Sequence, residues 1–290
     1  MTRRPLSDSL LELGVSQRFI DEVIAPIMRV NYGQNVSIPA FVGAVSLAGA
    51  QSNLWSVEGG NKLVCSGLLK TANANLHQAQ VTSISPVTSG DTLQYRLTFT
   101  SESGSGSDVY DIVVLATPLQ ESVQSGIKFE DFTPPFDELP GYYHSTVATI
   151  VHGYLNTSFF GFPDPRLFPF ASVLTTDEPQ LFFNSVASIC PVNISTALDK
   201  SQLKALFRSY YSVQLTEWLA YPRYGSTTGL PSIELHPNLY YLNGIEWAGS
   251  AMEMSSVAAK NIALLAYHRW NRQGDMVDQK DLMHKIKTEL

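Results

Sequence analysis

A continuous apolar run, Ile112-Val113-Val114-Leu115, does most to constrain how this chain can fold. Such a run is typical of a strand that is buried on both faces, because successive side chains of a strand point to opposite sides. Residues 93–99 instead alternate apolar and polar, as a half-buried strand does, and residues 252–270 have the pattern of a long helix. These patterns predict a mixed α/β fold, and 290 residues are enough for one large domain or two interleaved ones.

Further elements follow from hydrophobic spacing and from turn residues. Ser16 is expected to cap a helix that carries apolar side chains at intervals of three and four up to Met28, and Pro26 should kink that helix or end its first part. Residues 103–108 are expected to form a flexible Gly/Ser turn, and residues 218–224 an aromatic loop. We also expect helices over residues 40–50, 61–76, 200–213 and 277–287, and strands over residues 80–85, 110–116, 144–154, 180–189 and 239–242.

Charge and cysteine content limit the classes of function. The formal net charge of -7 disfavours nucleic acid as a partner, because an acidic surface repels phosphate. No charge occurs between Arg29 and Glu58, but the apolar part, residues 38–50, is shorter than the roughly 20 residues of a membrane span. We therefore expect no transmembrane span there, but a helix packed closely against a neighbour. Cys65 and Cys190 are expected to be two buried free thiols, although one disulfide between them is also compatible with the sequence.

The sequence lacks the motifs of several common enzyme classes. It has no Gly-x-Ser-x-Gly for a serine hydrolase and no Gly-x-x-x-x-Gly-Lys-Ser/Thr for a P-loop. It also has no Cys-x-x-Cys and no pair of histidines spaced for one face of a helix. We therefore predict no metal site.

The first pattern that points to a cofactor is Gly59-Gly60, followed by a helix and by the short strand that carries Val81. Two glycines let a backbone approach a neighbour or a ligand closely. The arrangement resembles flavoprotein oxidases of the amine oxidase type, in which a backbone valine lies against the adenine of FAD, and Val81 is the matching position. The alternative is an ordinary helix–strand connection.

The second pattern is the end of the strand over residues 110–116. Ala116 and Thr117 follow the apolar run, and Pro118 comes next. Nucleotide-binding sheets use small residues where the cofactor crosses the carboxyl ends of the strands, because they leave room for the adenosine. The alternative is a core strand followed by a turn.

The third pattern is a strand that leads into Gly244 and Glu246 and then into a helix that begins at Met252, Glu253 and Met254. This order resembles FAD enzymes of the glutathione reductase type. There the glycine permits close approach of the phosphate–ribityl chain, the carboxylate accepts a ribityl hydroxyl, and the helix N-terminus faces the flavin. The alternative is a solvated glutamate before an amphipathic helix.

Longer runs make the resemblance specific. Five segments resemble the prenylcysteine oxidase family, and the similarity extends over essentially the whole chain: residues 16–34, 57–68, 219–222, 243–246 and 250–255. The resemblance implies a two-domain flavoprotein of the glutathione reductase and amine oxidase type. It further implies four parts: residues 1–78, helical with the Gly-Gly helix; residues 79–120, strands of the FAD-binding domain; residues 121–237, a prenylcysteine lyase-type substrate domain; and residues 238–290, which close the flavin site.

The resemblance also implies an activity. The family oxidises the carbon next to the sulfur of farnesyl- or geranylgeranylcysteine with FAD and oxygen, and yields cysteine, a prenyl aldehyde and hydrogen peroxide in the catabolism of prenylated proteins. Its setting is the lysosome, with secreted forms. Three glycosylation sequons, at Asn35, Asn156 and Asn193, agree with a glycoprotein. The sequence identifies no catalytic base.

A prenyl chain needs an apolar, aromatic-lined tunnel. The middle of the chain offers seven phenylalanines for it, although a plain hydrophobic core would use the same residues: Phe159, Phe160, Phe162, Phe168, Phe170, Phe182 and Phe183.

The sequence departs from the family at its beginning. It has neither the Gly-x-Gly-x-x-Gly that cradles the pyrophosphate nor a signal peptide, so we expect a chain that is incomplete at the N-terminus and binds FAD weakly or not at all. Two other hypotheses remain. The chain is a catalytically inactive member that acts as a lipid-binding or interaction protein, or it is a general flavin amine oxidase.

Overall fold

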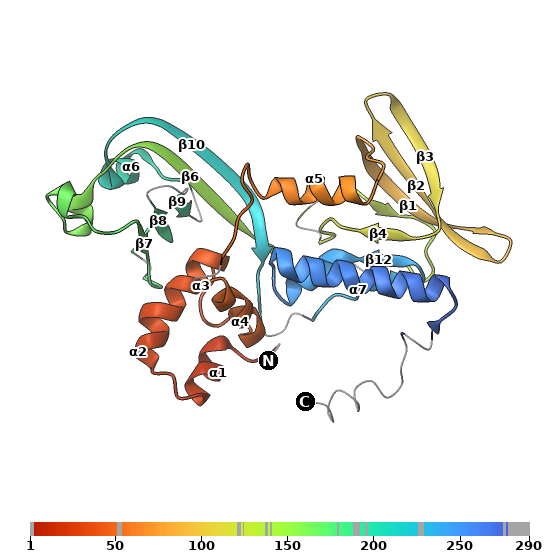
Figure 1. Ribbon diagram of the computed structural model, residues 1–290, viewed down its shortest axis with the longest axis horizontal. Helices are drawn as coiled ribbons and strands as arrows, with labels where there is room; N and C mark the ends of the chain where they lie inside the picture. The colour runs from red at the N-terminus through yellow and green to blue at the C-terminus, as the bar shows by residue number, and fades with distance from the viewer. Residues whose placement is uncertain are drawn as a thin grey trace. The chain divides into compact units, whose positions relative to one another are not determined.

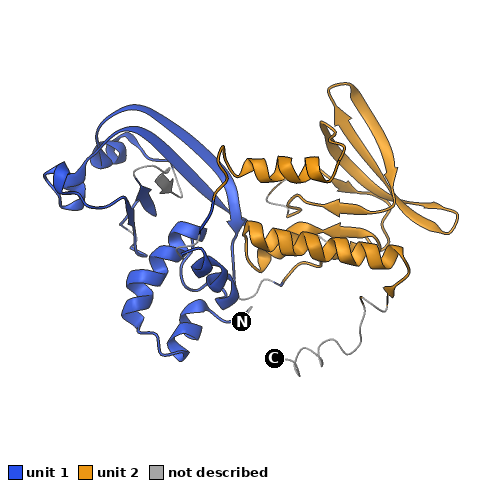
Figure 2. Ribbon diagram, viewed as in Figure 1, with its two compact units in different colours: residues 1–55, 141–229 blue, residues 56–140, 230–290 orange. Residues whose placement is uncertain are grey.

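The computed structural model describes residues 3–50, 54–120, 123, 125–136, 139, 141–178, 180–187, 192–194, 197–225, 229–274 and 277. The chain forms two compact units, each built from two separate segments (Figure 2). Unit 1 comprises residues 1–55 and 141–229, and unit 2 comprises residues 56–140 and 230–290. These two units divide the chain at other positions than the four functional parts implied by the resemblance. The units are defined by packing and not by function, so the four parts remain a prediction.

Unit 1 begins with a cluster of short helices. They are α1 (Leu6–Glu12), α2 (Gln17–Phe19), the π-helical η1 (Ile20–Ile24), α3 (Ala25–Tyr32) and α4 (Ala40–Ala48). As predicted, Ser16 caps the second helix, since its side chain accepts from the Phe19 N–H. Pro26 lies in the first turn of α3, directly after the π-helical turn. Gly43 of α4 packs closely against Leu6, which confirms the close-packed helix expected there.

The sheet of unit 1 has the order β10-β6-β9-β8-β7 (Figure 1). Its strands are β6 (Tyr143–Leu155), β7 (Ser172–Leu174), β8 (Ser185–Ala187), β9 (Val192–Ile194) and β10 (Phe207–Pro222). The connections carry η3 (Thr157–Phe160), η4 (Pro165–Leu167) and α6 (Lys200–Leu206). Leu203, Leu206 and Phe207 pack with Phe183 and Val186 in one core at the far end of the β6–β10 pair.

Unit 2 contains two sheets and two helices. The antiparallel β3 (Gly104–Tyr110), β2 (Thr92–Ser101) and β1 (Ala79–Ser89) are joined by β5 (Lys128–Phe129), which is parallel to β1. The second sheet has the order β11 (Glu234–His236), β12 (Leu239–Tyr241), β4 (Val113–Leu115). The helices are α5 (Lys62–Thr71) and α7 (Met252–Trp270), and η5 (Leu242–Trp247) links β12 to α7.

The strand that is covered on both faces is β12 and not the apolar run of β4. Tyr240 packs under Ile262 and Ala266 of α7, while Leu239 and Tyr241 pack on the other face against the core shared with β1 and β2. In β4, Val113 and Leu115 are buried but Val114 is exposed, because β4 is an edge strand and α7 covers its neighbour. The prediction of two-sided burial was therefore wrong for β4.

Three other predictions were wrong where strand pairing overrides local sequence. Most of the expected Gly/Ser turn belongs to β3, which pairs with β2 along its length. The helix predicted over residues 200–213 ends at Leu206, and residues 207–213 continue as β10, paired with β6. Most of the expected aromatic loop, up to Pro222, also lies in β10. Long-range backbone pairing supplies hydrogen bonds that no local pattern reveals.

Two further predictions concern the cysteines and the end of the chain. Cys65 is a free thiol, but it is exposed on α5, which buries none of its residues, so its predicted burial was wrong. Cys190 and residues 278–287 of the last predicted helix lie outside the described residues. Among the helices that the structure describes, none combines the length and the hydropathy needed to cross a bilayer.

Candidate functional site

The candidate site is the edge of the sheet where β4 and β12 end side by side. The two strands are parallel and in register, with Tyr241 opposite Leu115. Ala116 and Thr117 therefore leave the sheet beside Leu242, at the start of η5. Open sheets of this kind bind their ligands at the carboxyl ends of parallel strands. The structure thus brings the second and third predicted patterns to one edge.

Glu246 lies half-buried in η5, between β12 and α7. Its Oε1 accepts a hydrogen bond from the Nδ2 of Asn243 at 3.1 Å, which orients the carboxylate within the turn. Burial raises the pKa of the Tyr241 phenol, and the charge of the Glu246 carboxylate raises it further. The carboxylate is therefore held at the sheet edge and is not simply a solvated side chain.

Helix α7 begins at this edge without a side-chain cap. Its N-cap residue is Ala251, whose methyl side chain cannot accept a hydrogen bond from the first backbone N–H groups. Met252 and Glu253 are exposed, and Met254 is half-buried. Unsatisfied N–H groups give a helix N-terminus a partial positive charge, so this end of α7 can face an electron-rich group.

Two buried polar atoms at the same edge have no partner among the described residues. They are the Nε2 of Gln120, in the loop after β4, and the Oδ1 of Asn243. The Tyr241 hydroxyl donates to the Oε1 of Gln120 at 3.4 Å and so ties this loop to β12. Buried polar atoms normally have a hydrogen-bond partner, so an unpaired donor and an unpaired acceptor indicate room for a polar ligand. The sequence reading missed Gln120, since a lone glutamine carries no motif.

The predicted glycines have different surroundings. Gly244 is buried, and a Cβ there would lie 3.3 Å from the carbonyl oxygen of Pro231, so its close approach is to protein backbone. Gly59 and Gly60 have φ angles of +84° and +104° in the exposed turn before α5. A Cβ on either would meet only side chains of the same turn, so a positive φ explains both glycines.

Val81 connects the first pattern to the edge through the core. It lies at a register shift between β1 and β2 and packs, half-buried, against the cluster that contains Leu115 and Tyr241. The structure therefore brings Ala116, Thr117, Gly244, Glu246 and the start of α7 to one sheet edge, and it connects Val81 to that edge through the shared core. No described contact joins Gly59 or Gly60 to them.

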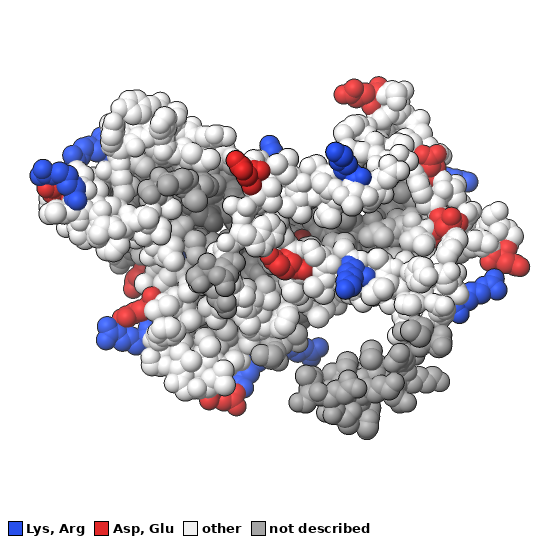
Figure 3. All heavy atoms as spheres, viewed as in Figure 1, with Lys and Arg blue, Asp and Glu red and all other residues white. Residues whose placement is uncertain are grey.

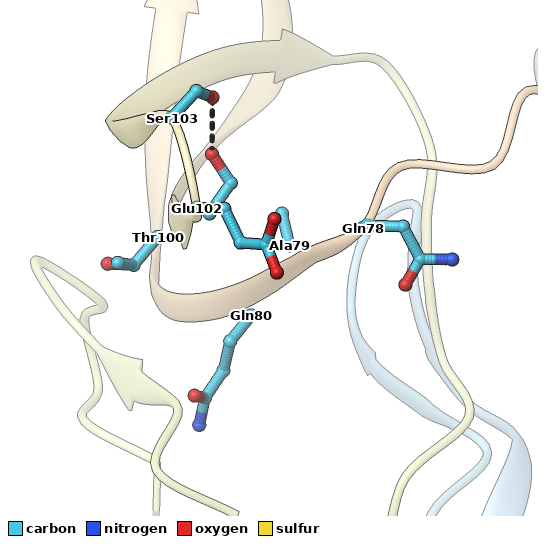
Figure 4. A pocket seen from close by; sticks show the side chains of 7 residues that line it. Gln78, Ala79, Gln80, Thr100, Glu102 and Ser103 are labelled. Carbon is cyan, nitrogen blue, oxygen red and sulfur yellow. Dashed lines mark hydrogen bonds between the residues drawn. The ribbon is translucent and has the colours of Figure 1, made fainter.

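Two surface hollows of unit 2 lie elsewhere. One of about 650 Å³ lies between the start of β1 and the β2–β3 turn, lined by residues 78–80 and 100–103 (Figure 4). The other, of about 450 Å³, lies at the amino end of β4 and the last turns of α7. None of the predicted site residues lines either of these two hollows.

The seven phenylalanines of the predicted tunnel form one cluster in unit 1. Their ring centroids lie 5.1–6.4 Å apart in a continuous chain of contacts. Phe183 is fully buried at its inner end, while Phe159 and Phe170 are exposed at its outer end. The cluster is thus more than a closed core, because it reaches the surface.

These features define a mixed α/β protein. Two parallel strands end beside the N-terminus of a helix in one unit, and the other unit holds an aromatic cluster. Residues 1–279 match the family model for prenylcysteine lyase. The chain is 54% identical to prenylcysteine oxidase 1-like from Mus musculus and 46% identical to prenylcysteine oxidase 1 from Homo sapiens, in each case over 100% of this chain. It covers 63% and 62% of the lengths of these two proteins.

The chain therefore belongs to the prenylcysteine lyase family, and the family predicted from its sequence is confirmed.

Proposed function

We propose that the chain acts as an FAD-dependent oxidase that cleaves the thioether of farnesyl- or geranylgeranylcysteine. In the overall reaction the substrate, oxygen and water give cysteine, a prenyl aldehyde and hydrogen peroxide. The carbon next to sulfur loses two electrons and its bond to sulfur, water supplies the aldehyde oxygen, and oxygen takes up the electrons. The family match along residues 1–279 is the observation that carries this proposal.

The sheet edge fits FAD in the kinds of group it offers. The Glu246 carboxylate would accept a ribityl hydroxyl, and the uncapped N-terminus of α7, with Met252, Glu253 and Met254, would face the flavin ring. Ala116, Thr117 and Val81 would lie beside the adenosine, and Gln120 would gain a partner for its unpaired Nε2. The chemistry that FAD supplies when bound is hydride acceptance from the substrate carbon.

The aromatic cluster of unit 1 is the proposed binding surface for the prenyl chain. A continuous set of rings offers a long apolar ligand burial and edge contacts without polar groups to desolvate. The same cluster would serve the second hypothesis, a non-catalytic lipid-binding protein, so binding alone does not separate the two.

We also propose that the protein is a lysosomal or secreted glycoprotein. Asn35 is exposed, so glycosylation is possible there in the folded chain. Asn156 is half-buried and its Nδ2 donates to the Ala205 carbonyl at 2.9 Å, so the folded protein does not present it. Peptide mapping of protein from secretory cells should find glycan on Asn35 and little on Asn156. Glycan on Asn156 alone would contradict this assignment.

Peroxide release tests the catalytic proposal. The chain is purified, supplied with FAD in large excess because its binding is expected to be weak, and incubated with farnesylcysteine, geranylgeranylcysteine or spermine. We expect peroxide and prenyl aldehyde in equal amounts from the prenylcysteines and none from spermine. Binding of farnesylcysteine without turnover would instead support the lipid-binding hypothesis, and turnover of spermine would support an amine oxidase.

A further inference from the structure

A group of exposed apolar side chains lies at one end of unit 1, and we call it the apical patch. Phe159, Leu167 and Phe170 are 40%, 69% and 50% exposed. They come from η3, η4 and the segment after η4, beyond the end of the β6–β10 pair (Figure 1). Large apolar side chains that are exposed together on a protein surface indicate a site that binds an apolar partner.

Ordered structure supports the patch from behind. The ring centroids of Phe159 and Phe160 lie 5.1 Å apart, and the chain of contacts continues through Phe168 to Phe170. The Asp164 side chain caps η4 by accepting from the Arg166 N–H. The exposed rings are therefore held outward by a packed aromatic layer.

The same end of unit 1 is basic, although the whole chain carries a net charge of -7. Helix α6 packs beside η3 and presents Lys200 and Lys204, and Arg208 follows at the start of β10. Both acidic residues of segments 155–170 and 197–211 are engaged, since Asp164 pairs with Arg166 and Asp199 caps α6. Figure 3 shows basic side chains over this end. The local positive charge stands out against an acidic molecule.

We propose that the apical patch docks on the surface of an anionic lipid bilayer. Phe159, Leu167 and Phe170 would enter the boundary between headgroups and acyl chains, while Lys200, Lys204 and Arg208 contact anionic headgroups. Exposed Tyr154 and Tyr211, near the ends of the two long strands, flank the patch as aromatic residues do at membrane interfaces. The combination of apolar protrusions with exposed cations on the neighbouring α6 and the start of β10 favours a lipid surface over a nucleic acid or a purely polar protein partner. Phe159 and Phe170 also belong to the aromatic cluster proposed above for the prenyl chain, but vesicle binding tests docking without measuring enzymatic activity.

Vesicle co-sedimentation tests the proposal. The purified chain is mixed with vesicles of phosphatidylserine and phosphatidylcholine, or of phosphatidylcholine alone. We expect binding to the anionic vesicles and at least several-fold less to the neutral ones. The triple variant F159S/L167S/F170S should lower the partition coefficient at least about tenfold, because each side chain contributes its own apolar transfer free energy. The matched control L63S/L68S/L76S replaces residues that are 45%, 64% and 69% exposed in unit 2, and it should bind like the wild type.

Two further measurements keep the result interpretable. K200Q/K204Q/R208Q should bind anionic vesicles less and lose most of the salt dependence, because screening acts on these charges. The wild type already contains four tryptophans, so the single variant F170W is compared with it. Lipids brominated in their acyl chains should quench F170W more than the wild type, which reports insertion without relying on the triple variant's folding.

Three outcomes would overturn the proposal. The first is no binding to either vesicle. The second is equal loss of binding in the triple variant and its control. The third is a dimer of the wild type in sedimentation velocity that the triple variant abolishes without vesicles, which would make the patch an interface between copies of this chain.

Discussion

Tyr95 has one hydroxyl proton and two polar neighbours, each at 2.5 Å. They are the Nδ1 of His236 and the carbonyl oxygen of Pro237. Burial raises the pKa of the Tyr95 phenol, with Tyr240 adding to the effect, so the hydroxyl keeps its proton. Only one assignment satisfies both contacts: the hydroxyl donates to Pro237, and a protonated Nδ1 of His236 donates to the hydroxyl oxygen. This assignment puts a proton on the Nδ1 of His236, and burial lowers the pKa of the ring, which favours its neutral form.

This assignment predicts a dependence of stability on pH. Burial lowers the pKa of His236 in the folded state below its ordinary value of about 6.5. The unfolded state therefore binds the proton more readily. The contribution of neutral His236 to the free energy of unfolding is complete above about pH 6.5. It is lost as the pH falls from there through the lower folded-state pKa. Urea unfolding between about pH 7.5 and 5 should show this loss in the wild type and a smaller loss in H236Q. The exposed control H77Q should keep the wild-type slope; equal slopes in H236Q and the wild type would contradict the assignment.

Glu246 carries the second residue-scale prediction. Its carboxylate is the proposed acceptor for a ribityl hydroxyl, and E246Q keeps the shape but removes the charge. A hydrogen bond to a charged group contributes about 1.5–3 kcal/mol, so the Kd for FAD should rise roughly tenfold or more. Flavin fluorescence titration measures it. E102Q makes the same change at an exposed position of the same unit and should leave the Kd unchanged. If the Kd for FAD is the same in E246Q as in E102Q, Glu246 does not bind the cofactor.

The residues around Glu246 show what the sequence could reveal. Glycine, carboxylate and helix start have a recognisable order, so Gly244, Glu246 and Met252 could be selected by spacing alone. Gln120 and Tyr241 could not, because their roles depend on a hydrogen bond between two segments that are far apart in sequence. The sequence also could not show that Gly244 approaches Pro231.

Among whole elements, those with strong local patterns were predicted best. Helix α7 spans residues 252–270 as expected, and β6 extends the predicted strand by one residue at each end. Strands β3 and β10 were not predicted, since Gly and Ser in β3 and the helix-like start of β10 oppose strand formation. These segments are strands because β3 pairs with β2 and β10 pairs with β6. Element boundaries thus followed local propensity where strand pairing agreed with it, as in β6, and not where pairing opposed it, as in β3 and β10.

Gly33 lies where the end of helix α3 packs against strand β6, so a substitution there tests this contact. It ends α3 with φ +61°, and a Cβ there would collide with the ring of His144 on β6. Gly33→Ala should therefore cost about 1 kcal/mol for the left-handed backbone and roughly 1–3 kcal/mol more for the collision. Gly14→Ala is the matched control, because Gly14 has φ +84° with nothing within 4 Å of a Cβ. Denaturant unfolding should show a larger loss for Gly33→Ala; equal losses would mean that the His144 ring moves aside without cost.

On the scale of the whole molecule, the chain enters each unit twice. Composition allowed two interleaved domains, but which segments join could not be read from the sequence, because hydrophobic spacing is local. Unit 1 has its own clusters around Met28 and Leu206, and unit 2 has its own around Tyr95 and Tyr240. A set of residues with its own core can unfold as its own cooperative unit.

The two units should therefore give two thermal transitions in calorimetry. Gly33→Ala acts only on unit 1, so it should lower one transition and leave the other in place. Tyr95→Phe removes a buried hydroxyl from unit 2 and leaves Pro237 and His236 without their partner, at a cost of about 1–3 kcal/mol, so it should lower only the second transition. A single transition that both variants lower by comparable amounts would mean that the three chain crossings couple the units into one cooperative structure. In that case each core would depend on the other for its stability, and the division into two units would describe geometry without describing energetics.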